Sequence, residues 1–399
     1  MSIDVLHVVP AFFPTRGGIE VLVENLTQAL NVSSGLTHGV LSPRVDGERP
    51  DDYLHGNTRV WSVDAPHPNS LRQYYEGIEI IPQESIDFAR ILRDTRRHIK
   101  EIQPTIVHLH GFSLVGSAAA AIAEAWGIPM VMHVHGSVDG GLSVRMRRQL
   151  TRSDFTIAVS EYVASSIERE THRTDGVVIV RNGLADPMSD QAIHAPSENR
   201  ISITMVGRLE ATKGFDVGLK AVARIIEEFP AMTVNIVGVG VEQNSLANLA
   251  CELGLEREVV FWGRLDRPDV LEKIRDSTCV VVPSIDLEGF SLVALESALL
   301  ERPVVASRVG GLPETVIDGQ TGTVVDPLSV DQLAEALRTY FSTPALASQH
   351  GRNARERALR EFTLERTVLQ VQAIHGQVMD RISRERVTTK SAHSLDLNT

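Results

Sequence analysis

Two cations in the second half of the chain have the types and spacing expected of a site for a diphosphate. Arg208 lies near the end of the apolar run ISITMVGRL, directly after Gly207, and Lys213 follows within one short loop before a helical run. A guanidinium binds phosphate as a planar fork and an ammonium binds it as a point charge. The pair therefore predicts a diphosphate site, although solvated loop charges are the commoner explanation of this pattern taken alone.

Two carboxylates follow in the segment PSIDLEGFSLVALESALLERPVVAS at 283–307. Glu288 ends a strand-to-helix loop, and Glu296 lies inside an otherwise apolar helical run, where an ionised carboxylate is costly unless it is paired. Eight helical residues rise about 12 Å, on the order of the distance from a sugar to a ribose across a diphosphate. Glu288 is predicted to meet sugar hydroxyls and Glu296 a ribose diol, with buried structural carboxylates as the alternative. The acidic stretch 286–288 also resembles a short metal motif, but the glycine-containing helix start after it favours a sugar.

Backbone groups complete this candidate site. Amides at a helix N-terminus attract anions, so the start of the helix after Glu288 is predicted to cradle phosphate and sugar, and the end of the strand containing Trp262 is where a base could lie. The residues concerned are Gly289, Phe290, Ser291 and Leu292 at the helix start, and Arg264 and Leu265 after the strand.

The first half of the chain offers a glycine pair and four histidines. Gly17 and Gly18 separate a first strand from its helix, which predicts either an anion site or a turn. HLHG at 108–111 and HVHG at 133–136 each close a strand. A metal site is the alternative interpretation of these histidines, but no Asp, Glu or Cys completes a ligand set, so polar strand ends facing a cleft are expected. His135, last in its strand, is the histidine predicted to contact a ligand.

The elements that must position these residues alternate regularly. Short apolar runs alternate with amphipathic runs on both sides of a polar stretch, which predicts two doubly wound α/β domains with parallel sheets. Ligands in such sheets bind at the carboxyl ends of the strands, and two domains imply a central cleft between them. The predicted organisation is an N-terminal domain at 1–185, a linker at 186–200, a second domain at 201–362, a C-terminal helix at 363–386 packing back on the first domain, and a disordered tail at 387–399.

Composition excludes several classes of protein. The chain has 399 residues, 43% hydrophobic and 23% charged, without an apolar run long enough to cross a bilayer, and its net charge of −12 disfavours nucleic acid as a partner. Two cysteines cannot form a disulfide framework, and the start of the chain lacks a secretion signal, so a cytoplasmic protein is expected. VGVG at 237–240 fails the dinucleotide pattern because Gln243 replaces the third glycine.

These residues resemble the retaining glycosyltransferases of the GT-B fold, specifically glycosyltransferase family 4. The resemblance runs from residue 3 to about residue 380, and it is carried by GGIE (17–20), VHLHG (107–111), HVHGS (133–137), AVSEYVA (158–164), RNG (181–183), VGRLEATKG (206–214), the segment 283–307 and GGLPETVIDGQTG (310–322). It implies that the EX7E pair, Glu288 and Glu296, contacts donor sugar and ribose, and that Arg208 and Lys213 bind the donor phosphates. Gly18 and His135 are implied to reach the diphosphate and the sugar from the first domain.

The resemblance also implies a reaction. A sugar would pass from a nucleotide sugar, UDP-sugar being favoured, to an acceptor hydroxyl with retention of configuration, without metal or cofactor and without a side-chain nucleophile. A GT-B-type epimerase or phosphorylase, or a non-catalytic nucleotide-sugar-binding subunit, is the alternative. We expect a small polar or carbohydrate-like acceptor. Arg90, Arg93, Arg97 and Lys100 form a basic stripe that can dock on anionic lipid, but membrane association is not favoured, because an outer helix must show some charged face to water.

Overall fold

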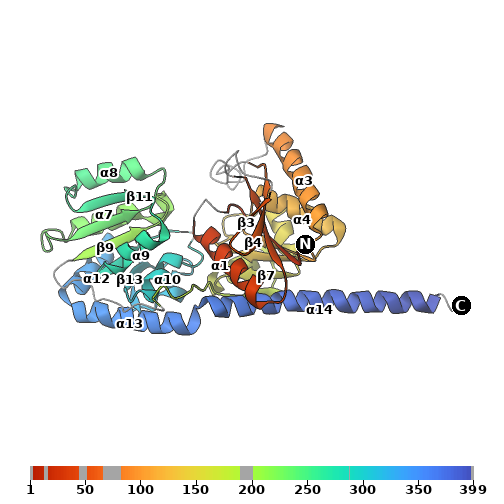
Figure 1. The fold of residues 1–399 in the computed structure, drawn as a ribbon. Coiled ribbons are helices and arrows are strands. Elements are labelled where there is room, and N and C mark those ends of the chain that lie inside the picture. The colour runs from red at the N-terminus through yellow and green to blue at the C-terminus, as the bar shows by residue number, and fades with distance from the viewer. Residues whose placement is uncertain are drawn as a thin grey trace. The chain divides into compact units, whose positions relative to one another are not determined.

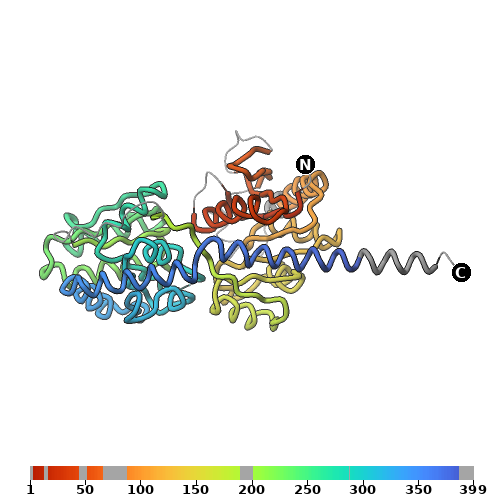
Figure 2. Tube along the Cα trace, turned by 60° about the horizontal axis from the view of Figure 1, so that its bottom comes forward, coloured from red at the N-terminus to blue at the C-terminus, as the bar shows by residue number. Residues whose placement is uncertain are grey.

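A computed structural model of the chain describes residues 3–12, 17–44, 52–65, 82–188, 201–286 and 288–396. It divides into two compact units (Figures 1 and 2). Unit 1 comprises residues 1–159, 163–181 and 364–399, and unit 2 comprises residues 160–162 and 182–363. Within the described residues, the structure has no helix whose length and apolar character would let it cross a membrane.

Unit 1 is built on an eight-stranded sheet with the strand order β3-β4-β2-β1-β5-β6-β7-β8. Neighbouring strands are parallel except β3, which pairs with β4 in the antiparallel sense. Its elements are β1 (Val5–Val8), α1 (Gly18–Ser33), β2 (His38–Pro43), β3 (Asp52–His55), β4 (Thr58–Val63), α3 (Pro82–Ile102), β5 (Ile106–His110), α4 (Leu114–Trp126), β6 (Met130–Val134), α5 (Val144–Arg152), β7 (Phe155–Ala158), α6 (Glu161–Thr171), β8 (Val177–Ile179) and α14 (Leu364–Asp396).

Local sequence sets where the helices of this unit begin and end. The Ser113 side chain accepts a hydrogen bond from the Gly116 amide and caps the start of α4, and Gly127, at φ 67°, ends it in the left-handed region. A hydroxyl at the N-cap and a glycine just past the last turn are the residues that satisfy the unpaired backbone groups of a helix. The alanine-rich helix between them packs along α3.

One face of this sheet is covered by α1 and α14, which contact each other. A hydrophobic core lies between this face and the two helices. It contains one residue from each of four neighbouring strands, two residues of α1 and four of α14: Val5, Ile106, Val131 and Ile157 of the strands, Leu26 and Leu30 of α1, and Val368, Val371, Ile374 and Val378 of α14. Side chains alternate between the two faces of a strand, so residues two apart share a face. His7, His108 and His133 therefore follow these aliphatic residues on the same face, toward the carboxyl ends of the strands.

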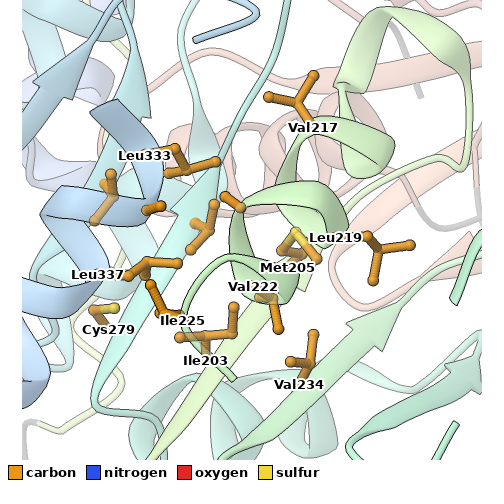
Figure 3. Close-up of a cluster of buried hydrophobic side chains, with 14 of the residues drawn as sticks. Ile203, Met205, Val217, Leu219, Val222, Ile225, Val234, Cys279, Leu333 and Leu337 are labelled. Carbon is orange, nitrogen blue, oxygen red and sulfur yellow. The ribbon is translucent and has the colours of Figure 1, made fainter. Parts of the chain in front are cut away.

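Unit 2 contains a six-stranded parallel sheet with the order β11-β10-β9-β12-β13-β14. Its core packs residues of β9, β10 and β12 against α7 and α12 (Figure 3), among them Ile203, Val234, Leu219 and Leu337. The elements are β9 (Ser202–Val206), η2 (Ala211–Lys213), α7 (Phe215–Ala223), β10 (Thr233–Val237), α8 (Gln243–Glu252), β11 (Val259–Gly263), α9 (Arg267–Arg275), β12 (Cys279–Val282), α10 (Leu292–Leu299), β13 (Val304–Ser307), α11 (Leu312–Thr315), β14 (Gly322–Val325), α12 (Val330–Ser342) and α13 (Pro344–Glu361).

The ends of the predicted segments differ from the observed ones. Leu364–Thr399 groups with unit 1, and the backbone of α14 is helical to Asp396 where a disordered tail from residue 387 was expected. That stretch contains neither glycine nor proline to end the helix. At the predicted linker, Asp186 already belongs to unit 2, where it accepts two hydrogen bonds from Arg355 at 2.9 and 2.7 Å. The rest of that linker, 189–200, lies outside the described residues.

Candidate active site

The strand order of unit 2 places the candidate site at the point where the chain reverses direction across the sheet. From β9 the chain moves outward through β10 to β11 and then crosses to β12 on the other side of β9. The loops after β9 and β12 therefore leave the sheet in opposite directions, and doubly wound sheets bind their ligands at such a point, outside the carboxyl ends of the strands. Lys213 lies in the first loop and Glu288 in the second.

Lys213 and Glu288 meet in the structure. The Lys213 Nζ donates to Glu288 Oε2 at 2.6 Å, and the Ser284 hydroxyl donates to the same oxygen at 3.1 Å. The side chains retain 26% and 12% of their exposure, so the pair is sheltered but reachable. An ammonium carries three N–H donors, and a carboxylate carries two acceptor oxygens. Lys213 can thus bind an anion while Glu288 Oε1 accepts a hydroxyl.

Backbone contacts hold the two loops together. The Ile285 amide donates to the Thr212 carbonyl at 2.9 Å. Gly214, at φ +65°, lies so near the second loop that a Cβ there would stand 2.1 Å from the Pro283 carbonyl oxygen. Only glycine has both the conformation and the space for this approach. The distance between Lys213 and Glu288 therefore depends on one glycine.

The helix start after Glu288 is arranged differently from the prediction. Ser291 is the N-cap of α10, and its side chain accepts from the Ala294 amide. Glu288 lies outside the helix, and its carbonyl accepts from the Gly311 amide at 2.8 Å. The separation of about 12 Å predicted from eight helical residues is wrong in its premise, because the helix begins only at Leu292. The Ser291 side chain takes the Ala294 amide, and the two amides before it, of Leu292 and Val293, are early helical N–H groups that lack intrahelical acceptors.

Glu296 has a partner that the sequence did not reveal. Arg267, the first residue of α9, stands 3.4 Å from Glu296 Oε1 through its guanidinium. Burial raises the pKa of Glu296, and the Arg267 charge opposes this shift. The Glu296 side chain retains 14% of its exposure. Arg267 itself follows Arg264 and Leu265 in a polar stretch, where its charge could not be told from a surface charge.

The other predicted cation points elsewhere. Arg208 Nη1 donates to Glu210 Oε1 at 2.8 Å, and 68% of the arginine side chain is exposed. The structure therefore pairs Lys213 with Glu288 and Arg208 with Glu210, two contacts that the sequence did not predict. Gly207 lies next to Arg208 and accepts a close approach from Gly238, where a Cβ would stand 1.8 Å from the Gly207 oxygen.

Trp262 lies in β11, the edge strand of the unit 2 sheet. Its indole N–H donates to Asn235 Oδ1 at 2.9 Å, and the Lys273 ammonium lies 3.9 Å from its ring centroid. Arg264 is exposed and Leu265 is partly buried in the loop that follows. This loop ends at Arg267, so the segment predicted to lie near a base is the one that carries the partner of Glu296.

The candidate residues of unit 1 lie at the start of helix α1 and after the end of strand β6. Gly17 is the extended N-cap of α1 and Gly18 its first residue. His135 follows β6, and its Nε2 lies 3.2 Å from Nδ1 of His110. Burial lowers the pKa of His135 to about 3, so its imidazole is neutral near pH 7. The expectation of polar strand ends facing a cleft is wrong for His108, His110 and His133, because their side chains are buried.

Within the described part of the chain, groups of residues with ligand atoms close enough to hold a metal ion occur only among histidines of unit 1. Among the described residues, Asp286 and Glu288 belong to neither of these groups. Glu288 is engaged by a cation and a hydroxyl instead.

Residues 16–185 match the family described as Glycosyltransferase Family 4, and residues 189–357 match the family described as Glycosyl transferases group 1. The glycogen synthase of Mycobacterium tuberculosis (strain ATCC 25618 / H37Rv) is 33% identical over 277 residues, which cover 65% of this chain and 66% of the relative. The D-inositol 3-phosphate glycosyltransferase of Corynebacterium glutamicum (strain R) is 27% identical over 354 residues, which cover 80% of this chain and 82% of the relative.

Solved structures agree on the fold. Sucrose-phosphate synthase from Thermosynechococcus elongatus superposes with a TM-score of 0.78 at 20% identity, covering 95% of this chain and 100% of that one. HepE of Anabaena, solved in complex with UDP and glucose, gives 0.72 at 19% identity, covering 93% and 99%. The two doubly wound units are those of the GT-B fold. The chain belongs to glycosyltransferase family 4, in group 1.

Proposed function

We propose that the chain transfers a sugar from a UDP-sugar to an acceptor hydroxyl with retention of configuration and without a metal. The observation that carries this is the Lys213–Glu288 pair at 2.6 Å, held between the loops after β9 and β12. A cation for a leaving diphosphate and a carboxylate for a sugar hydroxyl stand side by side at the position where doubly wound sheets bind ligands.

In this proposal each residue of unit 2 has a defined role. Lys213 neutralises charge that develops on the leaving diphosphate, and Arg208 does the same after its guanidinium leaves Glu210. Electrostatic stabilisation of this kind usually dominates catalysis. Glu288 orients the sugar through its free oxygen. Glu296, steadied by Arg267, accepts hydrogen bonds from the ribose diol. The amides at the start of α10 bind the diphosphate.

The chemical step follows from what these groups can and cannot do. Glu288 already accepts from Lys213 and Ser284, so it is a poor nucleophile and serves as an orienting group. The bond between the anomeric carbon and the diphosphate oxygen breaks, and the departing diphosphate accepts the proton of the acceptor hydroxyl. The bond from the anomeric carbon to the acceptor oxygen forms on the face of the sugar that the diphosphate leaves, so configuration is retained. By family resemblance, His135 contributes a neutral imidazole to the sugar, and Gly17 and Gly18 bring backbone amides to the diphosphate.

The relatives favour uridine and a polar acceptor. HepE was solved with UDP and glucose, and the curated relatives carry the names glycogen synthase and D-inositol 3-phosphate glycosyltransferase. We propose a small polar or carbohydrate acceptor on that basis. Calorimetric titration should show UDP bound more tightly than GDP or ADP; tighter binding of either by tenfold or more contradicts the uridine assignment.

Assays of donor turnover separate the four possible activities. A transferase releases UDP only when acceptor is present, and a phosphorylase requires inorganic phosphate. An epimerase converts the donor without acceptor, and a binding subunit does not turn the donor over. Activity should survive EDTA, because Lys213 and Arg208 can neutralise a diphosphate without an ion. Loss on chelation with recovery on adding Mg²⁺ or Mn²⁺ would reject the metal-free mechanism.

The site assignment is tested by removing one charge at a time. We expect Glu288→Gln and Lys213→Ala each to lower kcat/KM at least about 100-fold, which is about 2.7 kcal/mol of transition-state stabilisation. Lys220→Ala is the matched control, because Lys220 is an exposed lysine of α7 whose partner is Asp216 at 2.7 Å. It should retain wild-type kcat/KM. Wild-type turnover by Glu288→Gln or Lys213→Ala would remove the basis of the proposal.

A further inference from the structure

Unit 1 contains a cluster of imidazoles that the proposed transfer reaction does not use. Most of these rings are fully buried, and His135 is partly exposed at one end. Neighbouring ring centroids lie 4.3 to 5.9 Å apart, and the members are His7, His38, His108, His110, His133, His135 and His375. The cluster joins β1, β2, β5 and β6 to α14, and it occupies the sheet face above the aliphatic core of this unit.

A hydrogen-bonded chain of four rings runs through the cluster. His135 Nε2 contacts His110 Nδ1 at 3.2 Å, His110 Nε2 contacts His7 Nδ1 at 2.9 Å, and His7 Nε2 contacts His38 Nδ1 at 3.0 Å. The chain ends on the Ser34 hydroxyl, 2.9 Å from His38 Nε2. If every Nε2 carries the proton, each ring donates toward Ser34 and accepts from the ring before it.

His133 stands outside this chain. Both of its ring nitrogens are buried, and neither has a hydrogen-bond partner among the described residues; the same holds for His135 Nδ1. Burial lowers the pKa of His133 well below its ordinary value, with repulsion from His135 and His375 adding to the effect. The ring is therefore neutral, with one N–H and one lone pair unsatisfied, which is costly in a buried group.

We propose that His110, His133 and His135 form a binding site for a divalent transition-metal ion such as Zn²⁺. One ligand nitrogen from each ring lies within 4.8 Å of the others. The 3.2 Å between His110 Nδ1 and His135 Nε2 is close to the separation of about 3.4 Å that two nitrogens have in a tetrahedral zinc site. Three neutral imidazoles without carboxylate or thiolate select Zn²⁺, Co²⁺, Ni²⁺ or Cu²⁺ over Mg²⁺ and Ca²⁺.

A second trio, His7, His108 and His110, also has its nitrogens within 4.8 Å. Both nitrogens of His7 are already engaged, by His110 and His38, so a metal there would break that chain. The site with His133 instead uses the ring that lacks partners and displaces only the His110–His135 contact. Ligation by His110 Nδ1 leaves its Nε2–H donating to His7, the arrangement that orients metal-bound histidines.

The position of His135 provides the entrance for the ion and links metal binding to the transfer reaction. His135 is the partly exposed member, so the ion enters there and a water or anion takes the fourth position. A ring that binds metal is not available to a sugar. Zn²⁺ should therefore inhibit transfer, whereas chelators should not, which separates this site from a catalytic metal.

Binding is measured directly, independently of any transferase activity. Tag-free protein is titrated with Co²⁺ and followed by its visible d–d absorption, and Zn²⁺ affinity is obtained by competition with a chromophoric chelator. We expect about one equivalent per chain and no response to Mg²⁺. His133→Asn and His135→Asn should each weaken Zn²⁺ binding at least about 100-fold, more than the 10- to 100-fold typical of losing a group that only orients a ligand.

Two further variants make the result decisive. His172→Asn alters an exposed histidine at φ 55°, a conformation that asparagine tolerates, and should bind as wild type does. His108→Asn should also retain binding, because His108 belongs only to the other trio. Circular dichroism establishes whether each variant is folded. If His133→Asn does not fold, His135→Asn still provides the test, because His135 is partly exposed. Absence of stoichiometric binding by wild type, or loss in His108→Asn with retention in His135→Asn, overturns the assignment.

Discussion

Replacing Gly214 by alanine tests whether the approach of two loops sets the geometry of the candidate site. Gly214 is at φ +65°, and an added Cβ would stand 2.1 Å from the Pro283 carbonyl oxygen. Gly254 is at φ +69°, and an added Cβ there meets nothing within 4 Å. The two glycines share a backbone conformation and differ in surroundings, so Gly254→Ala is a matched control.

The expected magnitudes follow from these two environments. Alanine in the left-handed region costs about 1–2 kcal/mol, and this is the whole penalty expected for Gly254→Ala. Gly214→Ala carries the same penalty plus the cost of overpacking, about 1–3 kcal/mol, because the Pro283 carbonyl must move. That movement displaces the loop carrying Ser284 and Glu288 away from Lys213. We therefore expect UDP affinity to fall at least about tenfold in Gly214→Ala, or about 1.4 kcal/mol, and to stay unchanged in the control.

Unfolding of unit 2 can be followed by itself. Of the three tryptophans, Trp262 lies in unit 2 and the other two lie in unit 1, so a Trp61→Phe, Trp126→Phe background reports on unit 2 by fluorescence in urea. Equal losses of unfolding free energy in Gly214→Ala and Gly254→Ala would show that the clash is relieved without cost. Unchanged UDP affinity in Gly214→Ala would show that the loop contact does not control the site.

Other properties can be checked independently of donor binding. Burial lowers the pKa of His38 to about 4 and that of His375 to about 3, so below pH 6.5 the unfolded chain binds protons that the folded chain does not. As the pH falls from 6 to 5, unit 1 should lose up to about 1.4 kcal/mol of unfolding free energy for each such histidine, whereas no loss is expected between pH 8 and 7. The midpoint of urea unfolding, measured as a function of pH, tests this. His375→Gln should reduce the dependence of the midpoint on pH in the acid range. Cys251 is exposed and Cys279 is buried, with burial raising the pKa of its thiol. Ellman's reagent should therefore titrate one thiol rapidly in the native protein and two in denaturant.

The sequence was most informative where a strand is covered on both faces. The continuous apolar runs that became β1, β5, β6, β7 and β9 to β14 were predicted as strands. β2, β3, β4 and β8 were not predicted; β3, for example, is a partly exposed edge strand whose residues, Asp52–His55, carry no continuous apolar run. Fold class depends on the covered strands, so the missing edge did not alter it.

For the candidate site, local sequence identified the residues but not their partners. Lys213 and Glu288 were predicted as functional, yet their contact joins residues 75 apart and follows from the crossover between β9 and β12. The histidines show the same limitation more strongly. Spacing two apart places them on one face, but only α14 reveals that this face is covered, since His375 reaches His108 across 267 residues.

The return of α14 to unit 1 has a consequence for biosynthesis. Unit 2 is nearly continuous, from residue 182 to 363, whereas unit 1 needs Val368, Val371, Ile374 and Val378 to cover its sheet. A ribosome releases these residues after all of unit 2, so unit 2 can fold during translation while the face bearing Val5 and Ile106 still lacks its cover. Completion of unit 1 is therefore delayed until the residues that follow unit 2 have been made. A nascent chain stalled before residue 364 would expose that apolar face and the buried imidazoles beside it to chaperones and proteases.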